Sequence, residues 1–111
     1  MDDDVAVLAA VRRILTRYGY DVTAVASAAD AIAQYDRRPV DLLLTDVRMP
    51  EMDGPALVAQ LTAKHPDLRV LYMSGYTDGR LEGALTPGQR AFIAKPFTVE
   101  QLTIQIAALI D

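Results

Sequence analysis

The stretch VDLLLTDVRMPEMDG, residues 40–54, constrains the fold more than any other part of this chain. The leucine run that starts at Leu42 has no polar alternation, which is typical of a strand covered on both faces in a parallel sheet flanked by helices. Asp46 then falls at the carboxyl end of that strand, where open α/β sheets bind ligands. Aspartate is also common where strands end, because its side chain caps turns. From these residues alone, a ligand-binding role and a turn-capping role for Asp46 both stay open.

Strand-like and helix-like periods of apolar residues alternate along the rest of the chain. Strands are predicted at residues 20–26, in the opening stretch, at 69–74 and at 91–94. Helices are predicted before Gly19 and at residues 27–37, 54–65 and 98–110, with a weak, glycine-interrupted helix at 77–85. Because alternating strands and helices are joined by right-handed crossovers, the sequence predicts one α/β domain with a mostly parallel sheet and helices on both faces.

Local signals mark where several of these helices begin and which sides they bury. Ser27, with Asp30 three residues later, is a capping box, and Pro55 suits the first turn of the third helix. Asp53 is interpreted as a turn acid and not as a ligand. The last helix carries apolar residues at helical spacing that are predicted to pack inward: Val99, Leu102, Ile106 and Leu109.

Composition excludes several classes of function. The net charge is −4 and the pI is near 4.8, so no nucleic-acid partner is expected, because phosphate binding needs clustered lysine and arginine. The chain has no cysteine, which excludes disulfides and thiolate metal sites. No apolar run approaches the roughly 20 residues of a membrane span. We therefore expect no membrane association and a cytoplasmic location.

Five polar residues fall at one edge of the predicted sheet: Asp2 and Asp3 before the first helix, and Asp46, Ser74 and Lys95 at three strand ends. Three crowded carboxylates repel one another, so either a pKa rises sharply or a cation lies among them. Magnesium suits a site with aspartate and no histidine or cysteine. A lysine and a hydroxyl opposite that cation would complete an electrostatic site for a phosphoryl group.

In that order, Asp2-Asp3, LLLTDVRMPEMDG, MSGY and AKPF resemble the receiver domain of two-component response regulators over nearly the whole chain. The resemblance implies a flavodoxin-like (CheY-like) α/β fold, a doubly wound parallel sheet of strand order 2-1-3-4-5, with residues 1–111 as one receiver domain. VLYMSGYTD and KPFT look most like receivers attached to hybrid sensor histidine kinases.

The resemblance also implies a function and a cofactor. Asp46 would be the phosphoacceptor, taking a phosphoryl group from the phosphohistidine of a histidine kinase or histidine phosphotransfer domain. Mg²⁺ would be held by Asp2, Asp3, the Asp46 carboxylate and the backbone carbonyl of Arg48. An alternative assigns the acidic pair to Asp3 and Asp4, but the distance to Gly19 favours the first choice, with Asp4 as a first-turn acid that complements the helix dipole.

The remaining motif residues take roles by the same resemblance. Ser74 would bond one phosphoryl oxygen and Lys95 would pair with another. Phe92 matches the switch aromatic, whose rotation is coupled in the family to inward movement of the Ser74 hydroxyl. The Lys95–Pro96 bond is expected to be cis. His65 is interpreted as an exposed structural histidine and not as a phosphodonor.

The chain departs from the family at its start, because a receiver normally opens with an apolar strand that ends in the acidic pair. Here the chain starts at the pair, so the domain is interpreted as N-terminally truncated, with the first strand missing. The strand could precede residue 1 in a longer molecule, it could be supplied by strand exchange with a neighbour, or the chain could fold otherwise. Ile104 and Ala108 on the last helix would face either a dimer partner or the core.

Two rival functions come from other classes. The first is a docking module that keeps the receiver fold and is never phosphorylated. The second is a phosphohydrolase of the haloacid dehalogenase type, which places another aspartate two residues after its nucleophile. That position is Arg48 here, so we expect no enzyme activity beyond slow self-dephosphorylation.

Overall fold

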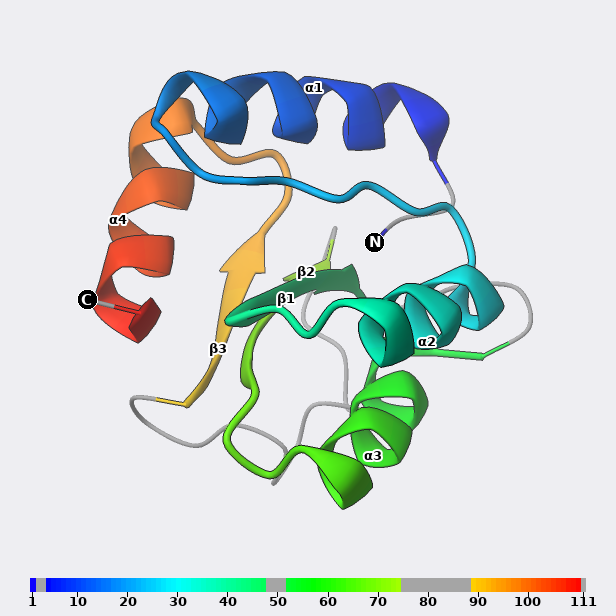
Figure 1. Cartoon of the computed structure of the whole chain (residues 1–111). Coiled ribbons are helices and arrows are strands. Elements are labelled where there is room, and N and C mark those ends of the chain that lie inside the picture. Colours follow the sequence, from blue (N-terminus) through cyan, green and yellow to red (C-terminus); the bar gives the residue numbers. More distant parts are fainter. Residues whose placement is uncertain (2–3, 48–51, 75–88, 111) are drawn as a thin grey trace.

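The structure is a computed structural model that describes residues 1, 4–47, 52–74 and 89–110 (Figure 1). The weak helix predicted at 77–85 lies outside the described residues. The elements, in chain order, are α1 (Val5–Arg17), α2 (Ala28–Arg37), β1 (Leu42–Asp46), α3 (Gly54–Lys64), β2 (Arg69–Ser74), β3 (Arg90–Ala94) and α4 (Val99–Ile110).

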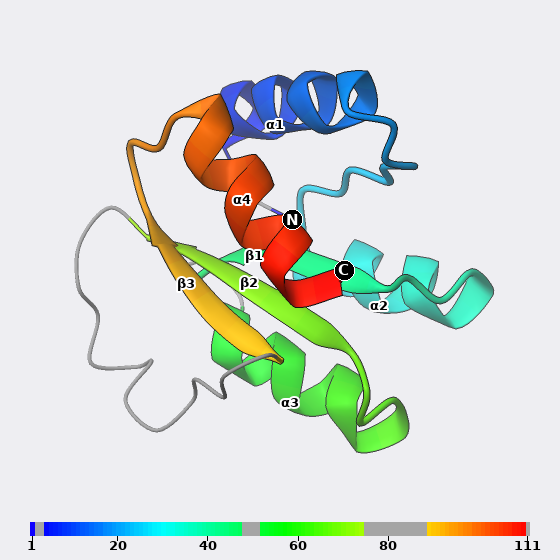
Figure 2. The same cartoon turned by 90° about the vertical axis from the view of Figure 1, so that its left-hand side faces the viewer.

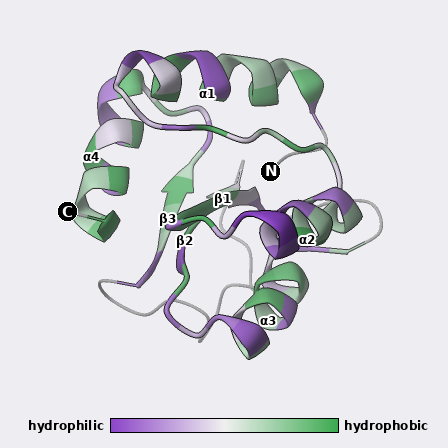
Figure 3. Ribbon diagram, in the orientation of Figure 1, coloured by the Kyte–Doolittle hydropathy of each residue, from purple (hydrophilic) through white to green (hydrophobic). Residues whose placement is uncertain are grey.

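The described strands form one parallel sheet in the order β1-β2-β3. Helices α1 and α4 lie on one face of this sheet, and α2 and α3 lie on the other (Figures 1 and 2). Each helix carries both hydrophobic and hydrophilic residues (Figure 3), as expected when one side of a helix covers a sheet. The predicted α/β class with a parallel sheet between two helical layers is confirmed.

Strand β2 is the centre of two separate cores. Val70 and Tyr72 pack with residues of α2 and α3, whereas Leu71 and Met73 pack with residues of α1 and α4. This division follows from the alternation of side chains along a strand. All four side chains are at most 1% exposed, and each buried aliphatic side chain contributes about 1.5–3 kcal/mol to folding.

The ends of three helices are fixed by aspartate and serine side chains. Asp4, Ser27 and Asp53 are the N-caps of α1, α2 and α3, and each side chain accepts a hydrogen bond from a backbone N–H in the first turn. The capping role of Ser27 was predicted. Asp4 was predicted to lie in the first turn of the helix, but it is the N-cap, one residue before the helix begins. Gly19 follows α1 with φ +89°, a left-handed conformation that favours glycine.

The predicted strand at residues 20–26 is wrong. The segment between α1 and α2 is irregular in the structure and runs beneath α1 (Figure 1). A strand needs a backbone neighbour, and in the predicted order 2-1-3-4-5 the only neighbour of this strand is the first strand of the sheet, which is not among the described elements. Alternating sequence alone therefore did not suffice for a strand here.

The predictions for the last helix hold for three of its four apolar residues. Leu102, Ile106 and Leu109 are buried, but Val99 is 40% exposed, because it is the first residue of α4 and no preceding turn packs beside it. Ile104 is 60% exposed and Ala108 is also exposed, so neither belongs to the core. Among the described residues, no helix is long and apolar enough to cross a membrane.

Burial of Tyr72 predicts a loss of stability at alkaline pH. Burial raises the pKa of Tyr72 above its ordinary value of 10.0, the Asp53 charge raises it further, and the Arg90 charge lowers it. The pKa of Tyr72 is higher in the folded chain than in the unfolded chain. The stability that comes from burying the neutral phenol is therefore fully present below about pH 10 and is lost as pH rises through the folded pKa. We expect Tyr72→Phe to reduce the fall in unfolding free energy between about pH 9 and 11.

The measurement is urea unfolding across this pH range. Tyr18→Phe is the matched control, because Tyr18 is 59% exposed, and it should leave the pH dependence of the wild-type chain unchanged. Parallel curves for Tyr72→Phe and the wild-type chain would contradict the prediction.

Candidate functional site

Three predicted site residues meet at the carboxyl edge of the sheet. Asp46 is the last residue of β1, Ser74 is the last residue of β2, and Lys95 directly follows β3. Asp46 pairs with Met73 and Ser74 pairs with Ala94 in the two parallel ladders. Because parallel strands in register end side by side, residues far apart in the sequence come together here.

An ion pair joins the outer two of these residues. The Lys95 Nζ atom lies 3.1 Å from Asp46 Oδ2. The two side chains are only 23% and 16% exposed, in contrast to 71% and 72% for the ion pair of Arg38 with Asp21. Exposed pairs contribute little because water screens them, so the Lys95–Asp46 pair is the stronger electrostatic feature.

Backbone hydrogen bonds hold Lys95 and Ser74 in fixed relation. The Lys95 N–H donates to the Ser74 carbonyl at 2.7 Å, and the Ser74 residue is 3% exposed. The Lys95–Pro96 peptide bond is cis, as the resemblance implied. Phe92 lies opposite Tyr72 in the β2–β3 ladder and packs, half-buried, against the core on the α2 and α3 side.

The backbone of Asp46 has partners that the sequence did not indicate. Its N–H donates to the Met1 carbonyl at 3.0 Å, and its own carbonyl accepts from the Thr45 hydroxyl at 3.0 Å. Thr45 is fully buried and Met1 is 7% exposed. No motif marked either residue, because both act through a contact made only in the folded chain.

Gly54 is a further residue of the site that sequence reasoning missed. Its N–H donates to the Val47 carbonyl at 2.8 Å. A Cβ atom added at Gly54 would lie 2.4 Å from the Asp46 carbonyl oxygen. The start of α3 can therefore approach the end of β1 only with glycine here, which fixes the backbone that carries the Asp46 carboxylate.

The predicted metal ligands are described only in part. Asp2, Asp3 and Arg48 lie outside the described residues. Within the described residues, no group of three or more histidine, cysteine, aspartate or glutamate side chains could hold a metal ion. Asp46 is thus the one predicted ligand whose position is described.

His65 does not join this site. It follows the last residue of α3 and is half-buried, and its ring centroid lies 4.4 Å from that of the buried Tyr35. Its structural role agrees with the prediction, although its side chain is less exposed than expected.

The contact at Gly54 predicts the effect of a single methyl group. Helix propensity alone would make Gly54→Ala stabilising by up to about 1 kcal/mol, but the contact with the Asp46 carbonyl reverses the sign. We expect a loss of about 1–3 kcal/mol, the usual result of overpacking, measured by urea unfolding, together with altered amide resonances of Asp46 and Val47.

Gly19→Ala is the control for this variant. It is also expected to destabilise, because of the positive φ at Gly19, but a Cβ there would contact nothing within 4 Å, so the Asp46 and Val47 resonances should not change. A stabilising Gly54→Ala variant would contradict the prediction.

Comparison with known proteins places this geometry in a family. The family model described as the response regulator receiver domain matches residues 1–107. The sensor kinase CckA of Brucella abortus is 33% identical over 99% of this chain and 12% of its own length. The DNA-binding transcriptional regulator NtrC of Klebsiella pneumoniae is 32% identical over 100% of this chain and 23% of its own length. The chain thus spans less than a quarter of these two relatives.

Solved structures agree with the family model. A CheY-like response regulator receiver domain protein from Methanospirillum hungatei superimposes with a TM-score of 0.88 at 27% identity, over 99% of this chain and 89% of the other. The relatives above include both a sensor kinase and a transcriptional regulator, so attachment to a hybrid kinase stays a prediction. By its sequence match, its sheet topology and the residues at its strand ends, this chain belongs to the family of response regulator receiver domains.

Proposed function

We propose that the chain is a phosphoacceptor switch in which Asp46 takes a phosphoryl group from the phosphohistidine of a histidine kinase or histidine phosphotransfer domain. The observation that carries the proposal is the partly buried Lys95–Asp46 ion pair at the carboxyl edge of the sheet. It joins a carboxylate nucleophile to a cation in a chain of the receiver family.

The chemistry follows from these groups. An Asp46 carboxylate oxygen attacks phosphorus, a P–O bond forms, the P–N bond breaks, and the electron pair of that bond returns to the imidazole nitrogen. Negative charge is shared among the phosphoryl oxygens during the transfer, so positioned cations and donors supply most of the catalysis. Lys95 would pair with one phosphoryl oxygen and the Ser74 hydroxyl would donate to another.

The Asp46 carboxylate is a suitable ligand for Mg²⁺. Asp46 offers carboxylate oxygen at the open edge of the sheet, and Mg²⁺ prefers oxygen donors. We assign the other ligands to Asp2, Asp3 and the Arg48 carbonyl. The bond between Met1 and the Asp46 N–H supports this set, because the acidic pair follows Met1 in the sequence. When bound, Mg²⁺ offsets part of the phosphoryl charge.

The output of the switch is a changed partner surface. Ser74 and Phe92 would couple phosphorylation to that surface, because they lie on adjacent paired strands, Ser74 at the carboxyl end of β2 and Phe92 opposite Tyr72, two residues before Ser74. Residues 1–111 would act as a receiver module that a histidine kinase phosphorylates. The composition predicts no nucleic-acid surface on this chain, but one relative is a DNA-binding regulator, so that prediction does not extend to a longer protein.

Phosphorylation of Asp46 is tested by intact mass after incubation with acetyl phosphate and Mg²⁺. We expect the mass to increase by one phosphoryl group, with no increase for Asp46→Asn, because the amide is not a nucleophile. Asp36→Asn is the matched control on the exposed side of α2, where Asp36 pairs with Lys64, and it should be phosphorylated like the wild-type chain.

The same sample tests the switch. Ring resonances of Phe92 should shift on phosphorylation of the wild-type chain and not of Ser74→Ala. A folded wild-type chain that gains no phosphoryl group would overturn the proposal and favour the docking module.

Removal of the Lys95 charge tests the electrostatic role of the ion pair. We expect Lys95→Met to slow phosphorylation about 10²-fold, the usual effect of losing one positioned electrostatic group, measured as the initial rate with acetyl phosphate. Lys64→Met removes a more exposed lysine that pairs with Asp36 and should leave the rate unchanged. Equal phosphorylation rates for the two variants would show that Lys95 has no role in the reaction.

A further inference from the structure

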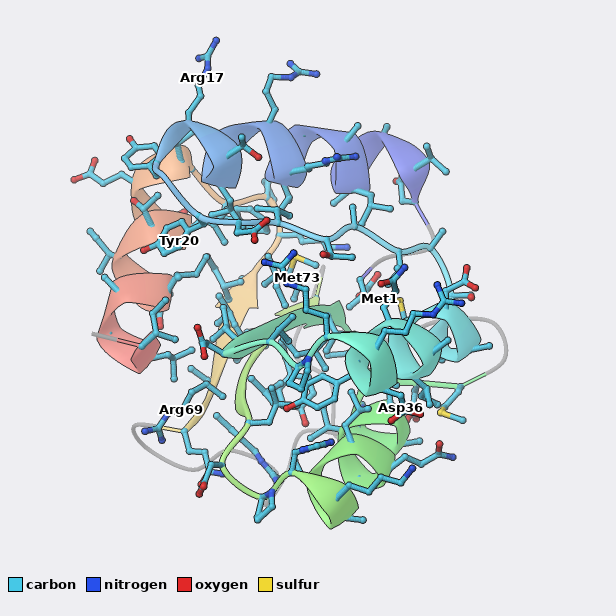
Figure 4. All side chains as sticks on the ribbon, viewed as in Figure 1. Met1, Arg17, Tyr20, Asp36, Arg69 and Met73 are labelled. Carbon is cyan, nitrogen blue, oxygen red and sulfur yellow. The ribbon has the colours of Figure 1, made fainter. Side chains whose placement is uncertain are left out.

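Helix α1 carries a cluster of positive charge in an otherwise acidic chain. The protein has a net charge of −4, yet α1 contains three arginines and no acidic residue. Arg12, Arg13 and Arg17 are all exposed. Arg17 projects away from the body of the protein, above α1 (Figure 4). The second half of this helix therefore presents concentrated positive charge to the surroundings.

These three charges have no counter-ion within the part of the chain that the structure describes. None of the three side chains forms an ion pair or hydrogen bond with a described residue, whereas Arg38 pairs with Asp21. The helix dipole favours a cation in the last turn, which accounts for Arg17 but not for Arg12 or Arg13. Like charges four residues apart, as in Arg13 and Arg17, destabilise a helix. A bound anion would offset this repulsion.

A groove of about 540 Å³ follows α1 past these arginines. Its volume lies within the roughly 300–1,000 Å³ of small-molecule binding sites. It is lined by α1 and by one residue of the segment that runs beneath this helix (Figure 1). None of the described residues that line it carries a carboxylate: Val5, Leu8, Ala9, Arg12, Arg13, Thr16, Arg17 and Ala24.

The two ends of this α1 groove differ in chemistry. The first half of the helix contributes Val5, Leu8 and Ala9, and the second half contributes the arginines. Val5 is 70% exposed, although removal of an apolar side chain from water is favourable. A helix rises 1.5 Å per residue, so Val5 and Arg17 are roughly 18 Å apart along the axis. A ligand that fits both ends combines an apolar chain with an anionic headgroup.

We propose that the α1 groove binds a single-chain alkyl phosphate, with the alkyl chain along Val5, Leu8 and Ala9 and the phosphate among the three arginines. The planar guanidinium group binds phosphate and carboxylate oxygens with paired hydrogen bonds. A phosphate monoester offers three terminal oxygens to the three guanidinium groups, whereas a carboxylate offers two. The groove shares no residue with the candidate site at the carboxyl edge, so its occupancy does not depend on the proposed function.

The test titrates decyl phosphate, below its micellar concentration, into the ¹⁵N-labelled chain. We expect saturable shifts of the amide resonances of Ala9 and Arg13, and a Kd that rises with salt concentration because salt screens exposed charges. Inorganic phosphate lacks the alkyl chain and decanol lacks the charge. Each should bind at least about tenfold more weakly than decyl phosphate, because each loses one of the two contributions.

Variants of the chain test the position of the ligand. Arg12→Gln and Arg13→Gln should each raise the Kd about tenfold, the usual effect of losing a hydrogen bond between charged groups. Arg69→Gln is their matched control, because Arg69 is exposed at the start of β2 and lies far from α1 (Figure 4). Ala9→Phe fills the groove and should abolish binding, whereas Ala10→Phe changes an exposed residue of α1 outside the groove and should leave the Kd unchanged.

Three outcomes would overturn the proposal directly. The first is no saturable shift at millimolar decyl phosphate. The second is equal binding to Ala9→Phe and Ala10→Phe, or to the groove variants and Arg69→Gln. The third is inorganic phosphate that binds as tightly as decyl phosphate, which would leave a site for simple anions and no role for the apolar end.

Two further outcomes would identify a different occupant and would also overturn the proposal. Shifts of α1 resonances with phosphatidylglycerol vesicles, but not with decyl phosphate, would assign the arginines to a membrane surface. Displacement of decyl phosphate by polyglutamate at an equal Kd would assign them to an acidic polypeptide.

Discussion

Pairing of the buried strand β2 with β1 and β3 is the constraint on which the site depends. Its side chains from Val70 to Met73 fill the cores on both faces of the sheet, so a shift of one residue would reverse which core each side chain enters. In that register Asp46 lies opposite Met73, the residue before Ser74. Ser74 lies opposite Ala94, the residue before Lys95. Core packing therefore fixes the candidate site. It sets the register of β2 against β1 and β3, and these two strands are aligned with each other through their pairing with β2.

The Lys95–Asp46 pair holds a partly buried carboxylate at the end of the sheet. Loss of Lys95 would leave a carboxylate that is only 16% exposed without this cation, which is costly in a partly buried place. A phosphoryl group on Asp46 would give Lys95 a new anionic partner at almost the same position. Under the proposed function, Lys95 would therefore serve both states, and the change on phosphorylation would fall on neighbouring groups such as Ser74 and Phe92.

Sequence patterns predicted the features of this fold that depend on local chemistry. Ser27 as a helix cap and the apolar run of β1 needed only neighbouring residues to be recognised. The strand at residues 20–26 was mispredicted because a strand also depends on a distant backbone neighbour. For the site, the strand ends of Asp46, Ser74 and Lys95 were predictable, whereas the contact of Gly54 with the Asp46 carbonyl exists only once α3 packs beside β1.

Met1 supports the backbone of the proposed phosphoacceptor Asp46. The Asp46 N–H donates to the Met1 carbonyl and the Asp46 side chain pairs with Lys95, so the contact with Met1 helps to hold this carboxylate in place. A change in the position of Met1 would therefore reach Asp46 through a single backbone hydrogen bond.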